Sequence, residues 1–340
     1  MHHDWEASGL RLPLLITGVA GVAGYNAYRY FSTRYPGQVI ATRRADNWPL
    51  QGEGIVGCDA DDGEQLAKLF ERYQFRSVLN SEGSCALKSC ELDPEMAFRV
   101  NVGSIESLLK TIKGSDVRLV HLSIDLVFSG GGDGQYVEDD RTNPVTVYGK
   151  TMVESEQLIL SLKSDACILR ISLPMGISFN GHAGAIDWIQ SRFKKSKPAT
   201  LYYDEIRSPM YTDCLNSVLD DILRRDLAGL YHAGGPNPLS LYQIAQIVNR
   251  VGGYDPELLM GCFRSEAGPM PPRAGNVTMS SDKLAAALGY EPFTSWPCFS
   301  EHLPTNPQWH HDRTNGGLGS AELIESVLYT NPRRRAEARK

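Results

Sequence analysis

The sequence has few of the features that mark zinc-binding, disulfide-stabilised or membrane-spanning proteins. Its seven cysteines are scattered, and no two form a C-x-x-C pair. Neither a zinc site nor a disulfide framework is therefore indicated, and a reducing compartment is favoured. The apolar stretch LPLLITGVAGVAG is too short and too rich in glycine to cross a membrane, and the start, MHHDWEASG, does not look like a signal peptide. We expect a cytoplasmic protein without a membrane segment.

The chain also lacks an excess of positive charge. Lys and Arg total 34 against 40 Asp and Glu, which gives a formal net charge of −6, so the composition does not favour a nucleic acid as partner. Hydrophobic residues are 42% and charged residues 22% of the sequence, ordinary values for a globular protein. His302, His310 and His311 could suggest a metal, but no cysteine or carboxylate keeps ligand spacing with them. We predict an exposed loop there and no metal site.

Short apolar runs alternate with amphipathic runs through the first half of the chain. The segments 12–18, 38–44, 77–83 and 118–130 contain apolar runs typical of buried strands, and helical periodicity occurs between them. Strands that alternate with helices predict an α/β fold with a doubly wound parallel sheet of the Rossmann type. After residue 170 the pattern loosens, which indicates a smaller C-terminal substrate lobe.

We divide the chain into four regions. They are an N-terminal extension (1–11), a dinucleotide-binding domain (12–170), a region that mainly forms the substrate-binding lobe (171–303) and a C-terminal tail (304–340). The second boundary need not be clean, because the chain can return to the sheet beyond it. The tail is rich in Gly, Asn, His and Arg and ends in PRRRAEARK. This composition predicts a poorly ordered, solvated end.

A glycine-rich loop joins the first predicted strand to the first predicted helix. GVAGVAG places glycines at Gly18, Gly21 and Gly24, with Val22 and Ala23 between the last two. Glycine leaves room for a tight turn and for a pyrophosphate against the backbone, and the following helix offers free N–H groups. In this context the loop predicts a dinucleotide-binding site, and the alternative is a turn with a structural role only.

The end of the second predicted strand carries Arg43 and Arg44 where a carboxylate would favour NAD. Guanidinium groups match the charge and geometry of a 2′-phosphate. The two residues therefore favour NADP(H), and the alternative is a pair of solvated loop arginines. Asp59, after the third strand, could lie beside the adenine, and Asn80, at the end of the fourth, is a further candidate for cofactor binding.

Taken together, these residues resemble the extended short-chain dehydrogenase/reductase superfamily, and more narrowly the dTDP-4-dehydrorhamnose reductase family. That family includes the regulatory beta subunit of methionine adenosyltransferase. The markers run from about Leu14 to Phe299 and include ITGVAGVAG, VLNSEG, DPEMAFRVNV, HLSIDLVFSG, YVEDDRTNPVTVYGKT, GLYHAGG and SSDKLAAALG. The resemblance implies a nucleotide-binding sheet and a small C-terminal lobe that holds a nucleotide-linked sugar.

The resemblance also assigns four catalytic positions, and two of them are apolar in this chain. The family's tyrosine matches Tyr148, and the asparagine of its V-N motif matches Asn101. The lysine four residues after the tyrosine matches Met152, and the hydroxyl residue of the S-T/S-D motif matches Ile124. The lysine would lower the pKa of the tyrosine, and the hydroxyl would donate to the carbonyl oxygen of a ketone. Methionine and isoleucine can do neither.

Two nearby residues could replace the missing groups. Lys150 is about 200° round the helix from Tyr148 and should face away from it. Ser123 is next to Ile124 and would point to the other face of a regular strand, although a bulge at the strand end could turn its hydroxyl into the site. Without the lysine, Tyr148 lacks its nearest expected positive charge, so we expect its pKa to lie closer to the unperturbed value.

Two functions follow from these residues. The first is an NADPH-dependent reductase of a nucleotide-linked 4-keto-6-deoxy sugar, with Tyr148 as proton donor. Arg207 and Arg273 could clamp the phosphates of the sugar nucleotide, or could be ion-pair partners. The second is a regulatory protein that binds the dinucleotide or the sugar nucleotide and has lost the chemistry. Glu82 and Cys85 would lie where cofactor and substrate meet, and a homodimer or a regulatory complex stays open in both cases.

Overall fold

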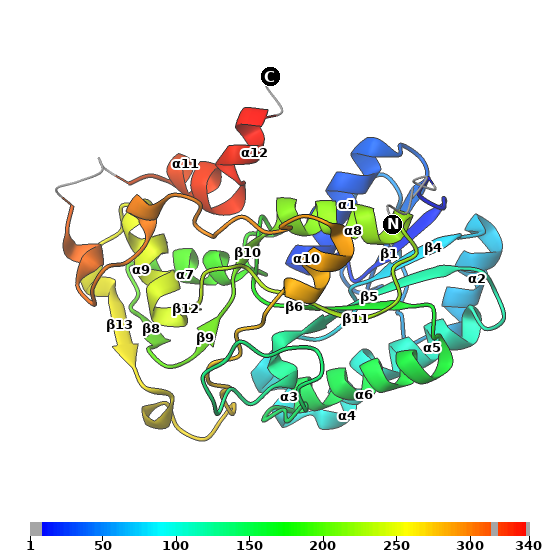
Figure 1. Ribbon diagram of the computed structural model, residues 1–340, viewed down its shortest axis with the longest axis horizontal. Coiled ribbons are helices and arrows are strands. Elements are labelled where there is room, and N and C mark those ends of the chain that lie inside the picture. Colours follow the sequence, from blue (N-terminus) through cyan, green and yellow to red (C-terminus); the bar gives the residue numbers. More distant parts are fainter. Residues whose placement is uncertain (1–8, 314–318, 338–340) are drawn as a thin grey trace.

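The computed structural model describes residues 9–313 and 319–337 (Figure 1). Its centre is one seven-stranded sheet with the strands β1 (Leu14–Thr17), β2 (Val39–Arg43), β3 (Ile55–Gly57), β4 (Ser77–Asn80), β5 (Arg118–Ile124), β6 (Cys167–Ile171) and β11 (Gly229–Ala233). All strand pairs in this sheet are parallel, in the order β11–β6–β5–β4–β1–β2–β3. Every residue of β1 and β4 is buried, as expected for parallel strands that are covered on both faces.

Helices cover both faces of the sheet (Figure 1). One face is covered by α1 (Val22–Arg34), α8 (Thr212–Arg224) and α10 (Asp282–Leu288). The other is covered by α2 (Gly63–Tyr73), α5 (Ser104–Thr111) and α6 (Val147–Leu162). The predicted doubly wound α/β fold is confirmed. None of the helices in the described residues is long and apolar enough to span a bilayer.

The segment between β4 and α5 contains two short helices and a π-helical turn. They are α3 (Leu87–Leu92), α4 (Pro94–Phe98) and the turn Arg99–Gly103. A single 3-10 turn, Asp125–Val127, follows β5. Both irregular segments lie beside the N-terminal half of α6 and therefore form part of the candidate site.

The C-terminal lobe consists of two longer helices and three pairs of short strands, on the left in Figure 1. The helices are α7 (Ala185–Lys194) and α9 (Leu241–Val251). The strand pairs are β7 (Pro174–Met175) with β10 (Met210–Tyr211), β8 (Ala199–Tyr202) with β13 (Leu259–Cys262), and β9 (Ile206–Arg207) with β12 (Leu239–Ser240). The chain returns to the sheet through α8, β11 and α10, as we expected, so region 171–303 contributes to both parts.

The described part of the C-terminal tail differs from the poorly ordered end that we predicted. It forms α11 (Ala321–Ile324), the π-helical turn Glu325–Tyr329 and α12 (Pro332–Glu337). Trp309 and Leu328 are buried in the core of the C-terminal lobe. His310 is buried as well, so our prediction of an exposed loop is wrong at that residue. Polar residues outnumber the few apolar residues that pack into the core, so the composition of this segment did not reveal them.

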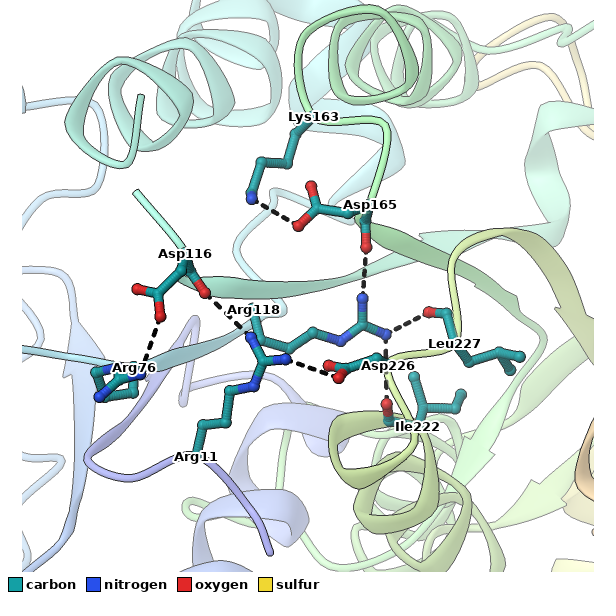
Figure 2. A network of polar contacts seen from close by, with 9 residues as sticks. All are labelled: Arg11, Arg76, Asp116, Arg118, Lys163, Asp165, Ile222, Asp226 and Leu227. Carbon is teal, nitrogen blue, oxygen red and sulfur yellow. Dashed lines mark hydrogen bonds and ion pairs between the residues drawn. The ribbon is translucent and has the colours of Figure 1, made fainter. Parts of the chain in front are cut away.

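A charged network joins several elements at the amino-terminal edge of the sheet (Figure 2). The buried Arg118 guanidinium, at the start of β5, donates hydrogen bonds to the main-chain carbonyls of Asp165, Ile222 and Leu227. Arg11 pairs with Asp226 at 2.7 Å and thereby attaches the end of the N-terminal extension. The network lies at the edge opposite to the glycine-rich loop, and it serves the fold.

Candidate functional site

The strand order predicts a binding crevice between β1 and β4. From β1 the chain proceeds outward to β2 and β3, then crosses to β4 and proceeds in the other direction. In open parallel sheets, ligands bind at the carboxyl ends of the strands at such a switch point. The glycine-rich loop follows β1 and the segment 81–83 follows β4, so the two flank the same crevice. The residues predicted to bind the dinucleotide therefore lie together at this edge of the sheet.

Two of the three loop glycines have no room for a side chain. Gly18 has a φ of +68°, and a Cβ on it would lie 2.3 Å from the carbonyl oxygen of Ser81. A Cβ on Gly24 would lie 2.6 Å from the carbonyl oxygen of Gly18. Gly21 differs, since a Cβ there would meet nothing closer than 3.6 Å. The loop therefore packs backbone against backbone, which keeps side chains out of the crevice at this point.

The first turn of α1 supplies hydrogen-bond donors for an anion. The N–H groups of Val22 and Ala23 precede the first main-chain bond of the helix, which Tyr25 donates to Gly21. No side chain caps this end. Free N–H groups and the positive end of the helix dipole favour a phosphate. These N–H groups fit the pyrophosphate of a dinucleotide. Such a dinucleotide, when bound, would supply a hydride.

The two arginines at the end of β2 have different surroundings. Arg43 donates to the carbonyl of Leu50 at 2.8 Å and to two carbonyls of its own loop at 2.9 and 3.2 Å. Arg44 is 43% exposed and makes only longer ion-pair contacts, 3.5 Å to Asp46 and 4.0 Å to Asp59. Asp59 also accepts a main-chain N–H of this loop at 3.0 Å. Arg43 therefore holds the loop, and Arg44 keeps donors for a 2′-phosphate.

Asn80 is buried and is used within the sheet. It accepts a hydrogen bond from the Thr17 hydroxyl on β1 and contacts Nδ1 of His121 on β5 at 2.8 Å. The three residues are register neighbours across β1, β4 and β5. Burial lowers the pKa of His121 to about 4, so the ring is neutral near pH 7. The structure thus gives Asn80 a role in joining the strands.

Tyr148 lies at the start of α6, beside the carboxyl end of β5. Thr146 caps the helix by accepting the N–H of Gly149 at 2.9 Å. A Cβ on Gly149 would lie 2.3 Å from a main-chain oxygen of the turn after β5, so this glycine lets the helix pack directly on that turn. Tyr148 shares one apolar cluster with Ile124 and with Met152, which is 2% exposed. The structure brings together three of the four positions that the family resemblance assigned.

The pKa of Tyr148 lies well above its ordinary value, an effect that our expectation from the missing lysine did not include. Burial is the main cause, the nearby Cys85 and Asp125 add to it, and Arg207 acts against it. Such a tyrosine keeps its proton near neutral pH and is a poorer acid than a free one. Lys150 is exposed, in agreement with the prediction that it faces away from the site.

Ser123 does not replace the missing hydroxyl. Its buried side chain donates a hydrogen bond to Glu156, which forms a buried ion pair with Arg170 at 2.7 Å. Arg170 also contacts His232 at 3.2 Å. Strand β5 pairs regularly with β6 as far as Ile124, so our hypothesis of a bulge that turns Ser123 toward the site is wrong. The hydroxyl belongs to a charged cluster between the sheet and α6.

Asn101 is buried in the π-helical turn before α5 and joins two segments of the site. Its Oδ1 accepts the N–H of Ser84 at 2.7 Å, and its Nδ2 donates to the hydroxyl of Thr151 at 2.8 Å. Thr151 in turn donates to the carbonyl of Tyr148 at 2.9 Å. Asn101 thus positions the segment after β4 against the helix that carries the tyrosine.

The predicted substrate residues Arg207 and Arg273 lie with two buried carboxylates. Arg207 binds Asp125 through two contacts, 2.7 Å from Nε to Oδ2 and 2.5 Å from Nη2 to Oδ1. Glu205 lies 3.8 Å from Arg207 and 3.6 Å from Arg273. Within the described residues, one Glu205 oxygen has no hydrogen-bond partner. Arg207 uses its guanidinium donors on Asp125. Arg273 is 26% exposed, so its guanidinium could also bind an anionic ligand.

Sequence reasoning missed both of these carboxylates. Asp125 directly follows Ile124 in the S-I-D motif, and Glu205 is two residues before Arg207. Their positions next to residues already singled out were the available signal. In the part of the chain that the structure describes, no group of three or more His, Cys, Asp or Glu side chains could hold a metal ion.

A pocket of about 490 Å³ lies away from the crevice, between α7 and the described part of the tail. Its buried polar groups satisfy one another, because Tyr329 donates to Asp187 and Gln190 donates to Tyr329 at 2.8 Å. We therefore assign function to the crevice and not to this pocket.

The family model of the RmlD substrate binding domain matches residues 12–300. The chain belongs to this family. The dTDP-4-dehydrorhamnose reductase of Mycolicibacterium smegmatis is 28% identical over 270 residues, which cover 76% of this chain and 80% of that protein. Methionine adenosyltransferase 2 subunit beta of Xenopus laevis is 25% identical over 244 residues, which cover 68% of this chain and 69% of that protein. The resemblance to the dTDP-4-dehydrorhamnose reductase family is confirmed.

Solved structures of the RmlD family and its neighbours share the fold. The dTDP-4-dehydrorhamnose reductase of Bacillus anthracis, in complex with NADP, gives a TM-score of 0.72 at 18% identity and covers 83% of this chain and 95% of that one. A UDP-glucose 4-epimerase of Thermus thermophilus, in complex with NAD, gives 0.72 at 19% identity, with 88% and 99% covered. The RmlD match ends before the packed C-terminal tail.

Proposed function

We propose that the chain binds NADP(H) in the crevice between β1 and β4 and a nucleotide-linked sugar in the C-terminal lobe, in a regulatory role that does not depend on ketone reduction. The observation that supports this proposal most strongly is Met152, which is buried beside Tyr148 at the position where the family's chemistry requires a lysine. A methionine can neither lower the pKa of a neighbouring tyrosine nor donate a hydrogen bond. Ile124, in the same cluster, stands where the family has a hydroxyl residue, so the second required group is also missing.

The residues of the crevice support the cofactor part of the proposal. The N–H groups at the start of α1 would hold the pyrophosphate, and Arg44 would bind the 2′-phosphate. A relative with the same fold has been solved with NADP. In the lobe, Arg273 would bind a phosphate of the sugar nucleotide. Tyr148 would hydrogen-bond an oxygen of the sugar while it keeps its own proton.

A slow reductase of a nucleotide-linked 4-keto-6-deoxy sugar is the second candidate. It is favoured by Tyr148 itself, which keeps the family's position, and by the positive charge of Arg207, which acts on the Tyr148 hydroxyl. In this case Tyr148 would donate the proton to the ketone oxygen without the help of a lysine. We expect such a reaction to be slow near neutral pH, because burial raises the pKa of the donor.

Binding and turnover measured side by side distinguish the two candidates. Calorimetry should show NADPH bound at least about tenfold more tightly than NADH, a difference of about 1.4 kcal/mol. The unmodified protein should not consume NADPH with a panel of 4-keto nucleotide sugars at a rate ordinary for enzymes, roughly 1 to 1000 per second. Such a rate would contradict the regulatory role, and equal affinities for the two dinucleotides would contradict the choice of NADP(H).

A further inference from the structure

Glu82 forms part of the wall of the crevice opposite the glycine-rich loop. It follows β4 by two residues, and a Cβ on Gly18 would lie only 2.7 Å from the Cα of Glu82. The side chain is only partly exposed. Ser81, the residue before it, donates a hydrogen bond to the carbonyl of Thr17 and thereby fixes the segment against the end of β1. Glu82 thus lies beside the glycine-rich loop against which a dinucleotide would bind.

Charged groups from three strand ends act on Glu82. Burial above all, together with Asp61 and Asp59 after β3, raises the pKa of Glu82 to a net value of about 7. The Arg44 guanidinium after β2 and a hydrogen bond from the Gly18 N–H lower this pKa. Glu82 therefore lies within the electrostatic influence of Arg44, the side chain to which we assign the 2′-phosphate, and beside the glycine-rich loop.

The other charges at this end of the crevice do not relieve the excess of carboxylates. Asp61 is paired with Arg99 at 3.1 Å, and Arg44 is shared among Asp46, Asp59 and Glu82. The same carboxylates, after burial, raise the pKa of the Cys58 thiol to about 12. An ionised Glu82 would repel the phosphates of a dinucleotide bound at the glycine-rich loop, whereas a neutral one would not.

We propose that Glu82 determines dinucleotide affinity, because its carboxylate must take up one proton from solvent when the phosphates of NADP(H) bind in the crevice. This inference rests on the proposed function. It predicts tighter binding in mildly acidic than in mildly alkaline solution. It also predicts that removing the charge of Glu82 strengthens binding.

The test compares NADPH affinity at pH 6 and pH 8 by calorimetry. The variants are the wild type, Glu82→Gln and the control Glu71→Gln, which changes an exposed residue of α2. At pH 8, Glu82→Gln should bind about tenfold more tightly than the wild type, and at pH 6 the two should be nearly equal. Glu71→Gln should follow the wild type. In buffers of different ionisation enthalpy at pH 7, the wild type should take up about half a proton per site more than Glu82→Gln.

The outcomes separate this inference from the proposed function. If the wild type and Glu82→Gln bind NADPH equally at both pH values, the role of Glu82 is overturned and NADP(H) binding stands. If neither binds NADPH at either pH, both are overturned. Glu82→Ala serves as a second neutral variant, and circular dichroism confirms that each variant is folded. If both neutral variants bind more weakly than the wild type at pH 8, Glu82 contributes a favourable contact and the inference is also overturned.

Discussion

Arg207 of β9 and Asp125 at the end of β5 form a buried ion pair with two contacts across the junction between the C-terminal lobe and the sheet. Ser172, which follows β6, donates a further hydrogen bond to the same carboxylate at 2.6 Å. The pair therefore joins three segments directly beside Tyr148. Because both charges are buried, the loss of Arg207 leaves Asp125 without an ionic partner, and the loss of Asp125 leaves Arg207 with only Glu205 at 3.8 Å.

Substitution of one partner should therefore destabilise the protein strongly. We expect Asp125→Asn or Arg207→Met to lower the free energy of unfolding by about 3 to 5 kcal/mol, measured by chemical denaturation. The double substitution Asp125→Leu with Arg207→Met should recover much of that loss, because no charge is then left unpaired. Lys68→Met, which removes an exposed ion pair with Glu64, should leave stability nearly unchanged. Losses that simply add in the double variant would contradict this account.

The glycine-rich loop provides a matched pair of substitutions. Gly18→Ala should weaken NADPH binding at least tenfold and lower the melting temperature, because Gly18 has a positive φ and no space for a Cβ. Gly21→Ala should have a much smaller effect on stability, since its Cβ would meet nothing closer than 3.6 Å. Equal effects of the two substitutions on the melting temperature would contradict the geometry described for this loop.

The arginines at the end of β2 give a third prediction. Arg44→Ala should remove most of the preference for NADPH over NADH, because Arg44 keeps donors for a 2′-phosphate. Arg43→Ala should instead act on stability, since Arg43 holds its loop through three carbonyls. Calorimetry with both dinucleotides, together with thermal denaturation, checks this division. A preference lost in Arg43→Ala and kept in Arg44→Ala would reverse our assignment.

The fold and the place of the candidate site could be predicted from the sequence. Which polar side chains are hydrogen-bonded within the protein, and which face a ligand, could not. Apolar runs such as LLIT and the glycine spacing identify buried strands and the loop between them, because these signals are local in the chain. Asn80 and Ser123 were predicted as site residues, yet their partners, His121 and Glu156, are 41 and 33 residues away. Tertiary pairing of this kind decides whether a polar side chain faces a ligand or the core, and no local pattern reveals it.

Acid should destabilise the protein through His121. In the unfolded chain the pKa of histidine is about 6.5, whereas burial lowers the pKa of His121 to about 4 in the folded protein. The unfolded state therefore binds the proton first as pH falls. Stability should decrease between about pH 6.5 and pH 4 by about 3 kcal/mol from this residue, and not further below that range. Denaturation curves across this range measure the loss.

Two variants test the assignment to His121. His121→Gln should be less stable at pH 7, because Asn80 loses its partner, but its stability should fall less steeply toward pH 4.5. His182→Gln, at an exposed position, should keep the slope of the wild type. A His121→Gln slope equal to that of the wild type would assign the acid sensitivity to other groups, such as the buried His232.

The last prediction concerns Met152. Because Met152 is 2% exposed in an apolar cluster, Met152→Lys should bury a charge and lower the free energy of unfolding by about 2 to 4 kcal/mol. Met152→Leu, which keeps the volume apolar, should cost less than about 1.5 kcal/mol. Burial should also lower the pKa of the new lysine in the folded protein. The unfolded state then binds the proton more tightly than the folded state, so the loss of stability should be largest at acid pH.

Combined with Ile124→Thr, the same lysine restores both groups that the family's chemistry requires. A large gain in NADPH consumption with a 4-keto nucleotide sugar would show that the pocket still accepts the family's substrate and lacked only these groups. No gain, with NADPH still bound, would mean that the lobe around Arg273 has diverged as well, in support of the regulatory role. If the unmodified protein already turns over such a sugar at an ordinary enzymatic rate, roughly 1 to 1000 per second, Met152 does not mark a loss of chemistry, and the reaction must proceed through another donor.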